Sequence, residues 1–296
     1  MDVRVSFIVP IYQSEPFLVE CLDSLLALDF RERYEVLLLD FGSQDASERI
    51  CTRYEREHPD MFRFIRCETN YGVSATRNLG LLWARGKYVS FVDSDDRLSK
   101  DFLSRLYPLM VKEDLDIVSA GYYLLGKRTR RGYSRINRSG DGKDFLRRLY
   151  KDPLLKTRTF VWGKLFKASL LKENRIQFPT DLLSFEDLPF YYQCLLAAKR
   201  VRYVKTPLYY YRQSSASLTK RTRGVLESHL LAFEKGRDII QKTDPALFQE
   251  LFGKKRLAIT LQLRYDSHLD IRKGKERAEA KRECRKAVES LFGKEK

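Results

Sequence analysis

The chain of 296 residues is 43% hydrophobic and 32% charged, so it can bury a large core, which excludes wholesale disorder. It contains no stretch of about 18 uncharged apolar residues of the kind that spans a membrane as a helix. Its 56 Lys and Arg outnumber its 40 Asp and Glu, giving a net charge of +16, which predicts an anionic partner such as nucleic acid, phospholipid or a phosphate-bearing substrate.

The positive charge is concentrated in two segments. Residues 127–158 hold 12 Lys and Arg against 3 Asp, and residues 253–296 hold 14 Lys and Arg against 7 Asp and Glu. The rest of the chain is balanced. The second segment has narrow apolar stripes among its basic residues, which fits a helix on an anionic membrane, a helix in a bundle, or a solvated helix.

The cysteines and the N-terminus predict the compartment. The 5 cysteines form no CxxC pair, which argues against a disulfide framework and against a zinc site. The first residues lack the charged lead, long apolar stretch and small-residue cleavage site of a signal peptide. We therefore expect a cytoplasmic protein with reduced thiols.

The first hundred residues alternate between strand and helix patterns. Continuous apolar runs predict strands at residues 3–9, 34–39, 62–66 and 87–92, and Pro10 is expected to end the first of them. Apolar residues at helical spacing predict helices at residues 15–28, from the turn at 42–45 to about 57, and at 73–84. This order predicts an α/β fold in which helices flank a mostly parallel sheet, with ligands beyond the carboxyl ends of the strands.

The pattern changes after the first hundred residues. A helix is predicted at 99–112, a strand at 116–125, an exposed basic loop at 126–142, a helix at 187–199, and short strands at 201–204 and 208–211. After residue 220 the pattern is helical to the end. A domain boundary is therefore expected between residues 215 and 225.

Acidic residues follow the ends of two predicted strands. Asp40 closes the second strand, and Asp93, Asp95 and Asp96 close the fourth. Neither a GxGxxG nor a GxxxxGK[ST] phosphate loop occurs, which disfavours dinucleotide oxidoreductases and P-loop enzymes. Three carboxylates in four residues repel one another unless a cation or hydrogen-bond donors offset them, and oxygen ligands suit Mg²⁺ or Mn²⁺. The alternative is a solvated turn with Asp as a helix cap.

Four motifs occur in order along the first hundred residues: SFIVPIY at 6–12, LDFGSQD at 39–45, NYGVSATRNLG at 70–80 and YVSFVDSDD at 88–96. Together they resemble the nucleotide-sugar glycosyltransferases of family 2, which have the GT-A fold. Three further motifs extend the resemblance to about residue 215: WGKLF at 162–166, FED at 185–187 and YYYR at 209–212.

The resemblance implies a division of the chain. Residues 1–218 would form the GT-A catalytic domain, with a nucleotide-binding half at 1–100 and an acceptor half at 101–218. Residues 219–296 would form a basic helical extension.

The resemblance also implies a donor site. Pro10, Tyr12 and Asp40 would surround the nucleotide base, and Arg77 would lie near the nucleotide or its diphosphate. Phe41 stands where the family commonly has a second Asp, so base recognition is the least typical part of the motif set.

The acidic motifs match the family's catalytic machinery. Asp93 and Asp95 would form its DxD motif, and Asp95 or Asp96 would bind Mn²⁺ or Mg²⁺ while the other carboxylates hold ribose or sugar hydroxyls. Glu186 and Asp187 match an acidic pair whose second member is the usual catalytic base. The alternative for this pair is an ordinary helix N-terminus, where acidic residues are favoured.

Several residues of the second half are candidates for the acceptor side. Trp162 and Tyr211, together with Tyr209 and Tyr210 of the same motif, can stack on sugar rings, although an aromatic stripe also fits a core. Arg212 belongs either to a loop that closes over the diphosphate or to a plain surface loop.

The predicted function is an inverting, metal-assisted transfer of sugar from a UDP-sugar to a hydroxyl of a lipid-linked or cell-surface glycan. One carboxylate base allows one in-line displacement, which inverts the anomeric centre. The basic C-terminal segment would hold the enzyme on the inner face of the membrane. The alternatives are a basic nucleic-acid-binding α/β protein, which would leave the strand-end carboxylates without a purpose, and an inactive glycan-binding relative. We expect no nucleic-acid partner.

Overall fold

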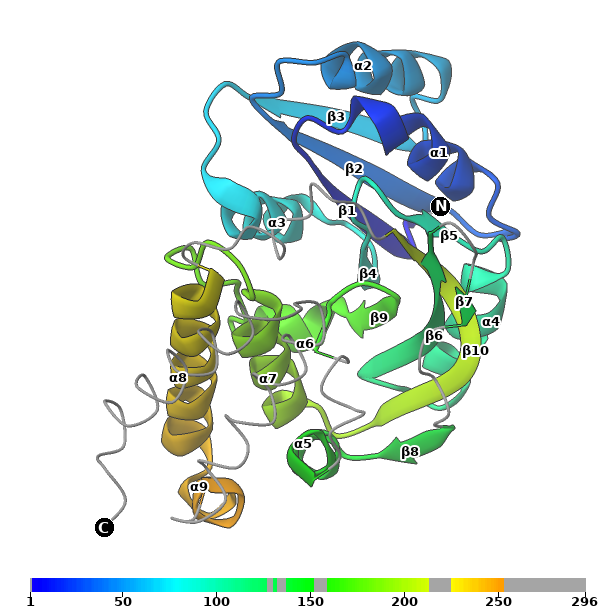
Figure 1. Ribbon diagram of the computed structural model, residues 1–296. Coiled ribbons are helices and arrows are strands. Elements are labelled where there is room, and N and C mark those ends of the chain that lie inside the picture. Colours follow the sequence, from blue (N-terminus) through cyan, green and yellow to red (C-terminus); the bar gives the residue numbers. More distant parts are fainter. Residues whose placement is uncertain (1, 127–129, 132–136, 152–158, 213–224, 253–296) are drawn as a thin grey trace.

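The computed structural model describes residues 2–126, 130–131, 137–151, 159–212 and 225–252 (Figure 1). The helices are α1 (Glu15–Leu26), α2 (Ser47–Glu57), α3 (Gly72–Trp83), α4 (Phe102–Lys112), α5 (Gly142–Lys151), α6 (Ala168–Glu173), α7 (Asp187–Ala197), α8 (Val225–Thr243) and α9 (Pro245–Phe252). The strands are β1 (Val5–Ile11), β2 (Tyr34–Phe41), β3 (Phe62–Cys67), β4 (Tyr88–Phe91), β5 (Arg97–Leu98), β6 (Ile117–Leu125), β7 (Arg130–Arg131), β8 (Arg138–Gly140), β9 (Lys164–Lys167) and β10 (Val201–Arg212).

The strands of the described residues form one sheet with the order β3-β2-β1-β4-β9-β6-β10-β5, to which β7 adds beside β6 and β8 beside β10. The pairs β1–β2, β1–β4, β2–β3 and β6–β10 are parallel, whereas β9 runs antiparallel to both β4 and β6. The predicted α/β fold with helices flanking a central sheet is confirmed. The sheet is mixed: β1 to β4, β6 and β10 run in one direction, whereas β5, β7, β8 and β9 are antiparallel to their neighbours. As a result, β1, β2 and β4 all end at one edge, where a ligand site is expected.

Side chains alternate between two apolar layers, one on each face of the sheet. In β1, Phe7 belongs to the layer beneath α1, α2 and α4, and Ile8 belongs to the opposite layer, which includes residues of α5 to α9. Figure 1 shows α1 and α2 together on one side of β1 to β3 and α3 on the other side. Both faces are covered, so the strands read as continuous apolar runs.

The first strand differs from its prediction because Pro10 does not end it. Ile8 accepts a hydrogen bond from Val92 N on the β4 side, and residues two apart in a parallel strand direct their backbone groups to the same side. Pro10 therefore faces the β4 side at a level where β4 has already ended at Phe91, and its missing N–H costs no ladder bond. β1 continues along β2 to Ile11.

The second half contains more structure than predicted. The two short strands predicted at 201–204 and 208–211 are one strand, β10, with an irregular register around Pro207. The predicted loop at 126–142 contains β7 and β8, and the rest of it includes residues outside the described ranges. The antiparallel strand β9 and the helix α6 were not expected, because each is too short to show a clear period. Helix α5 was also not predicted, although Phe145, Leu146 and Leu149 stand at helical spacing and are buried.

Helix α8 packs directly against α7. A Cβ atom at Gly236 of α8 would lie 2.8 Å from side-chain carbons of Leu188 and Tyr192 of α7, so the two helices approach closely. Ser228 also exchanges hydrogen bonds of 3.0 and 2.8 Å with the backbone of Ser184.

The predicted boundary near residue 219 and the segment 253–296 lie outside the described residues. No described helix is long and apolar enough to cross a membrane.

Candidate active site

The carboxyl-end edge of the sheet brings together acidic residues that are far apart in the sequence. The DSDD segment at 93–96 is separated by one residue from the end of β4, and the pair Glu186 and Asp187 lies at the start of α7. Arg77 of α3 joins them. Its Nη1 donates to Glu186 Oε1 at 2.6 Å and to Asp187 Oδ1 at 2.9 Å, and its Nη2 donates to Asp93 Oδ1 at 2.8 Å.

Arg77 is placed by the close contact of α3 with the sheet. A Cβ atom at Gly80, one turn later, would lie 2.5 Å from Ile8 and 2.8 Å from Leu39, so only glycine lets the helix lie this deep. Asn78 exchanges two hydrogen bonds of 2.8 Å with the backbone of Phe178. The Arg77 side chain is 4% exposed, and its guanidinium lies over the Phe178 ring.

The charges in this cluster shift the titration of its members. Burial raises the pKa of Asp187 to about 7, aided by the negative charges of Glu186 and Asp93 and opposed by Arg77. For Arg77, burial opposes the charged form, but Asp187, Asp93 and Glu186 outweigh it and raise its pKa. The Asp187 side chain remains 16% exposed, so this carboxylate can reach a substrate and exchange a proton near neutral pH.

The carboxylates of the DSDD segment have different surroundings. Asp96 is 1% exposed, and its two oxygens accept hydrogen bonds of 2.6 Å from Tyr209 Oη and Arg212 N. Burial, and then the charges of Asp93 and Asp95, raise the pKa of Asp96 well above its usual value. Asp96 therefore holds the turn to the end of β10.

Asp95 is only partly buried, and its carboxylate forms no ion pair with a described residue. Burial and the charge of Asp93 raise its pKa to about 6. Hard oxygen ligands without a neutralising side chain fit Mg²⁺ or Mn²⁺. Among the described residues, however, no group of three His, Cys, Asp or Glu could hold a metal ion by itself. The donor set thus fits a cation that takes its remaining ligands from water and a diphosphate.

Arg212 connects three parts of this edge. Its Nε donates to the Asp95 backbone carbonyl at 2.7 Å, its Nη2 pairs with Glu20 of α1, and its guanidinium lies over the Phe17 ring. The residue lies at the end of β10, immediately before residues outside the described ranges. Arg212 therefore stabilises the DSDD turn through hydrogen bonds to Asp95 and Asp96.

The predicted base-binding residues lie at the ends of β1 and β2. Asp40 is fully buried, where Ser43 N and Oγ donate to its Oδ1 at 3.2 and 2.5 Å. Burial raises the pKa of Asp40 despite these hydrogen bonds. Its Oδ2 has no hydrogen-bond partner among the described residues. Tyr12 is 50% exposed and Pro10 is partly buried, while Phe41 packs edge-on against the exposed Tyr71.

The aromatic residues of the acceptor half form a stack. Trp162 stacks on Phe160, Tyr209 and Tyr211 with centroid separations of 4.7, 4.5 and 5.2 Å. Trp162 is buried, so the stack leaves little of its indole for a sugar, whereas Phe160 and Tyr211 are partly exposed. Tyr209, another candidate for sugar stacking, is instead fully buried and donates a hydrogen bond to Asp96.

One backbone group also belongs to the site and could not be read from the sequence. Val161 N donates to Asp187 Oδ2 at 3.2 Å, so both oxygens of this carboxylate are oriented. The residue before the acidic pair, Phe185, has a left-handed φ of 64° and stacks on His229 of α8 at 4.3 Å. Such backbone strain concentrates at functional sites.

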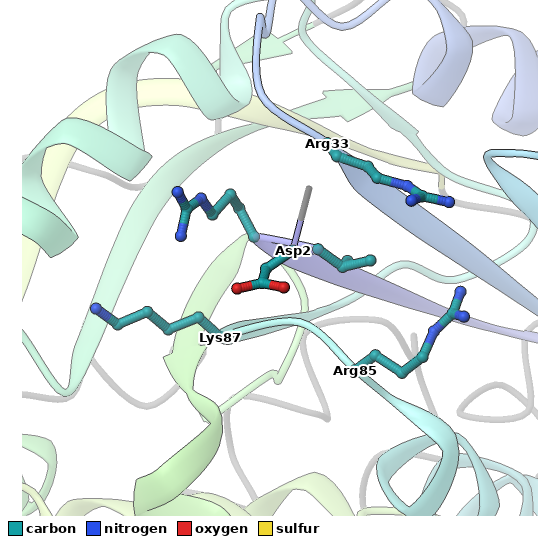
Figure 2. Close-up of a pocket in the computed structure, with 6 residues that line it drawn as sticks. Asp2, Arg33, Arg85 and Lys87 are labelled. Atoms are coloured by element: carbon teal, nitrogen blue, oxygen red, sulfur yellow. The ribbon is translucent and has the colours of Figure 1, made fainter.

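A cavity of about 460 Å³ lies elsewhere, lined by Asp2, Val3, Arg4, Arg33, Arg85 and Lys87. Figure 2 shows Arg33, Arg85 and Lys87 around Asp2. These residues precede or flank the starts of β1, β2 and β4, so the cavity lies at the opposite edge from the acidic cluster. Arg4 and Arg85 pair with Glu32 and Glu35, which neutralises part of its positive charge. We place the candidate active site at the acidic cluster.

Residues 6–174 match the family described as Glycosyl transferase family 2. The chain belongs to this family. The glycosyltransferase is 34% identical over 214 residues to the poly(ribitol-phosphate) beta-glucosyltransferase of Bacillus spizizenii (strain ATCC 23059 / NRRL B-14472 / W23). That match covers 71% of this chain and 32% of the relative, so the chain spans about a third of the relative's length.

Solved structures have the same fold. The Staphylococcus aureus TarS fragment 1–349 in complex with UDP has a TM-score of 0.68 and 24% identity, covering 89% of this chain and 70% of that one. The same fragment has been solved with UDP-GlcNAc. That structure has a TM-score of 0.67 and 22% identity, and the match covers 90% of this chain and 81% of that one. A Pyrobaculum calidifontis mannosyltransferase in complex with GDP-Man and Mn²⁺ has a TM-score of 0.54 and 17% identity, and the match covers 100% of this chain and 89% of that one. At these identities the likeness establishes the GT-A fold of the glycosyltransferase.

Proposed function

We propose that this glycosyltransferase transfers a sugar from a UDP-sugar to an acceptor hydroxyl by a single, inverting displacement with Asp187 as general base. The observation that carries the proposal is the Arg77 cluster, which joins the DSDD segment to the acidic pair 186–187. A donor-side motif and a candidate base thus share one site. The UDP and UDP-GlcNAc complexes of TarS support the choice of donor.

In this mechanism Asp187 accepts the proton of the acceptor hydroxyl as that oxygen attacks the anomeric carbon. The bond from that carbon to the diphosphate oxygen breaks, and the leaving group departs as UDP. The pKa of Asp187, about 7, suits a base that works near neutral pH. Arg77 keeps this carboxylate and Asp93 in fixed positions, and Glu186 keeps the guanidinium oriented.

A divalent cation is part of the proposal. Asp95 would hold Mn²⁺ or Mg²⁺, because Asp96 uses both of its oxygens within the protein. When bound, the cation supplies Lewis-acid stabilisation of the negative charge on the leaving diphosphate. Asp93, whose Oδ1 is taken by Arg77, keeps its other oxygen for hydroxyls of the ribose or the sugar.

For the acceptor we propose a cell-envelope glycan or polyol-phosphate polymer. Two observations support this choice: the name of the Bacillus spizizenii relative, a poly(ribitol-phosphate) beta-glucosyltransferase, and the excess positive charge of 127–158 and 253–296. Phosphates along such a polymer would complement the basic residues. Tyr211 and Phe160 are the partly exposed rings of the aromatic stack that could contact sugar faces.

The test compares Asp187→Asn with the wild-type protein for UDP release from UDP-sugars and for UDP affinity by calorimetry. We expect the rate to fall by about 10²- to 10⁴-fold, because that is the usual contribution of a general base, while UDP affinity stays the same. An unchanged rate would exclude Asp187 as the base. Asp95→Asn should instead abolish the dependence of UDP binding on Mn²⁺, and equal binding in excess chelator would exclude the metal role.

A further inference from the structure

The buried Lys164 lies one peptide group away from the candidate base Asp187, and the proposed mechanism gives it no role. It is the first residue of β9 and is 3% exposed. Lysine is almost never fully buried, because taking the ammonium out of water costs free energy that a Leu or Met at the same place would not cost. An apolar side chain would pack there without this cost, so the burial of a lysine indicates a role for its positive charge.

The contacts of Lys164 lead to Asp187 through one peptide group. Its Nζ donates a hydrogen bond to the carbonyl of Phe160 and lies 4.9 Å from the centre of the Tyr191 ring. The carbonyl of Phe160 and the N–H of Val161 belong to the same peptide group and point in opposite directions. That N–H donates to Asp187 Oδ2 at 3.2 Å. The ammonium and the carboxylate thus lie at the two ends of one peptide dipole.

The segment that carries this peptide is held firmly. Trp162 forms a parallel bridge with Phe91 at the end of β4, and the carbonyl of Gly163 accepts a hydrogen bond of 2.9 Å from Ala120 N of β6. Gly163 has a φ of +68°, which turns the chain so that the lysine reaches back to the carbonyl four residues earlier. The position of the Val161 N–H therefore depends on the fold and on Lys164.

We propose that Lys164 is a positioning residue for the general base: its ammonium holds and polarises the 160–161 peptide, so that the Val161 N–H stabilises the ionised form of Asp187. Hydrogen bonds in a chain strengthen one another, so a cation at the carbonyl makes the N–H a stronger donor. The catalytic consequence rests on the proposed function, whereas the effect on Asp187 itself does not.

Other charged groups also face Asp187. Arg77 favours its ionised form, and Glu186 and Asp93 oppose that form. Lys164 adds a second favourable influence from the β9 side. Removing it should weaken the Val161 hydrogen bond and raise the pKa of Asp187, because a carboxylate that loses a donor is protonated more easily.

The experiment follows the Val161 amide signal by NMR in protein labelled with ¹⁵N-valine, assigned by its loss in Val161→Ile. In the wild type this signal should titrate with Asp187, with a midpoint near 7, and it should stop titrating in Asp187→Asn. In Lys164→Met the midpoint should rise by about one pH unit. Lys167→Met is the matched control: it removes another lysine of β9, one that pairs with the exposed Asp114, and should leave the midpoint unchanged.

Kinetics give a second reading with the UDP-sugar that the wild type hydrolyses fastest. Below about pH 7, Lys164→Met should lower kcat by up to about tenfold, because a pKa one unit higher leaves at most that much less of Asp187 ionised. The acidic limb of the pH profile should shift upward by the same interval as the NMR midpoint, and KM should be unchanged. Lys164→Arg, which keeps the charge, should restore part of the rate.

A folded Lys164→Met protein with an unchanged midpoint overturns the proposal. Should this variant not fold, Lys164→Gln, which keeps a donor but no charge, serves the same test, and failure of both to fold would make the lysine structural and overturn it too. A wild-type rate in Asp187→Asn would instead defeat the proposed function while leaving the NMR result valid, so the two failures are distinguishable.

Discussion

At the scale of single residues, the site depends on one buried cation shared by three carboxylates. Each carboxylate would be costly to bury alone, and Arg77 would be costly without them. The fork of the guanidinium lets one side chain bind Glu186, Asp187 and Asp93 at once, which a lysine could not do with the same geometry. In this arrangement the pKa of Asp187 lies near neutral pH, so the carboxylate can accept a proton during a reaction.

The pH dependence of transfer should report Asp187. Because its pKa is raised to about 7 and the base must be ionised, kcat should rise as the pH increases through about 7. Steady-state rates with saturating donor, measured between about pH 5 and pH 9, check this expectation. The residual activity of Asp187→Asn should not rise with pH in this range. A wild-type kcat that stays constant down to about pH 5 would contradict the assignment of Asp187 as the base.

Loss of Arg77 should destabilise the fold. Arg77→Met leaves buried carboxylates without their cation, and we expect urea unfolding at neutral pH to show a loss of about 3–5 kcal/mol. The loss should shrink below about pH 6, because Asp187, with its raised pKa, is then protonated and needs no partner. Arg56→Met, at an exposed arginine with a weak pair, should change stability by less than about 0.5 kcal/mol.

At the scale of elements, helix α7 connects the acidic pair Glu186 and Asp187 to the helices that follow. Its first residue is Asp187, and its buried face meets α8 at Gly236. The strained Phe185 stacks on His229 of the same helix α8. The position of the acidic pair therefore depends on α8, even though α8 contributes no residue to the acidic cluster.

A side chain at position 236 should disturb this contact. A Cβ atom in Gly236→Ala would come within 2.8 Å of Leu188 and Tyr192, and overpacking of this kind costs about 1–3 kcal/mol. We expect a lower unfolding midpoint together with a lower kcat, because α7 must shift. Gly126→Ala is the control, since a Cβ there meets nothing within 4 Å. Equal stability of the two variants would show that α7 and α8 are coupled only loosely.

At the scale of the whole molecule, one of the two basic segments follows all of the proposed site residues. All proposed catalytic residues precede residue 213, whereas residues 253–296 carry an excess of 7 positive charges. We propose that this segment holds the enzyme on an anionic membrane, where a lipid-linked acceptor would reside. Each basic residue near such a surface contributes about 1 kcal/mol to binding.

Truncation after Phe252 tests this role. The shortened protein should no longer bind vesicles that contain anionic lipid, yet should hydrolyse UDP-sugar at nearly the original rate, because α8 and α9 are retained. Binding of the intact protein should weaken in about 1 M salt, where charges are screened beyond roughly 3 Å. Vesicle binding that survives truncation would instead assign the segment to packing or self-association.

The sequence by itself determined the α/β class, the positions of the first four strands along the chain and the acidic motifs. These features follow from local patterns: continuous apolar runs, helical spacing, and polar residues where a strand stops. The family follows from motifs such as the DSDD segment at 93–96, whose residues are adjacent in the chain. Adjacent residues keep their relationship whatever the rest of the fold does.

Only the tertiary structure decided how those motifs act on one another. Arg77 was expected near a diphosphate, but its guanidinium binds three carboxylates from two distant segments, a relationship set by the depth of α3 on the sheet. The same holds for Pro10, which β1 tolerates because β4 is shorter, and for Lys164, whose burial no periodicity reveals. Contacts between distant segments depend on packing and on strand order, and a one-dimensional pattern carries no measure of either.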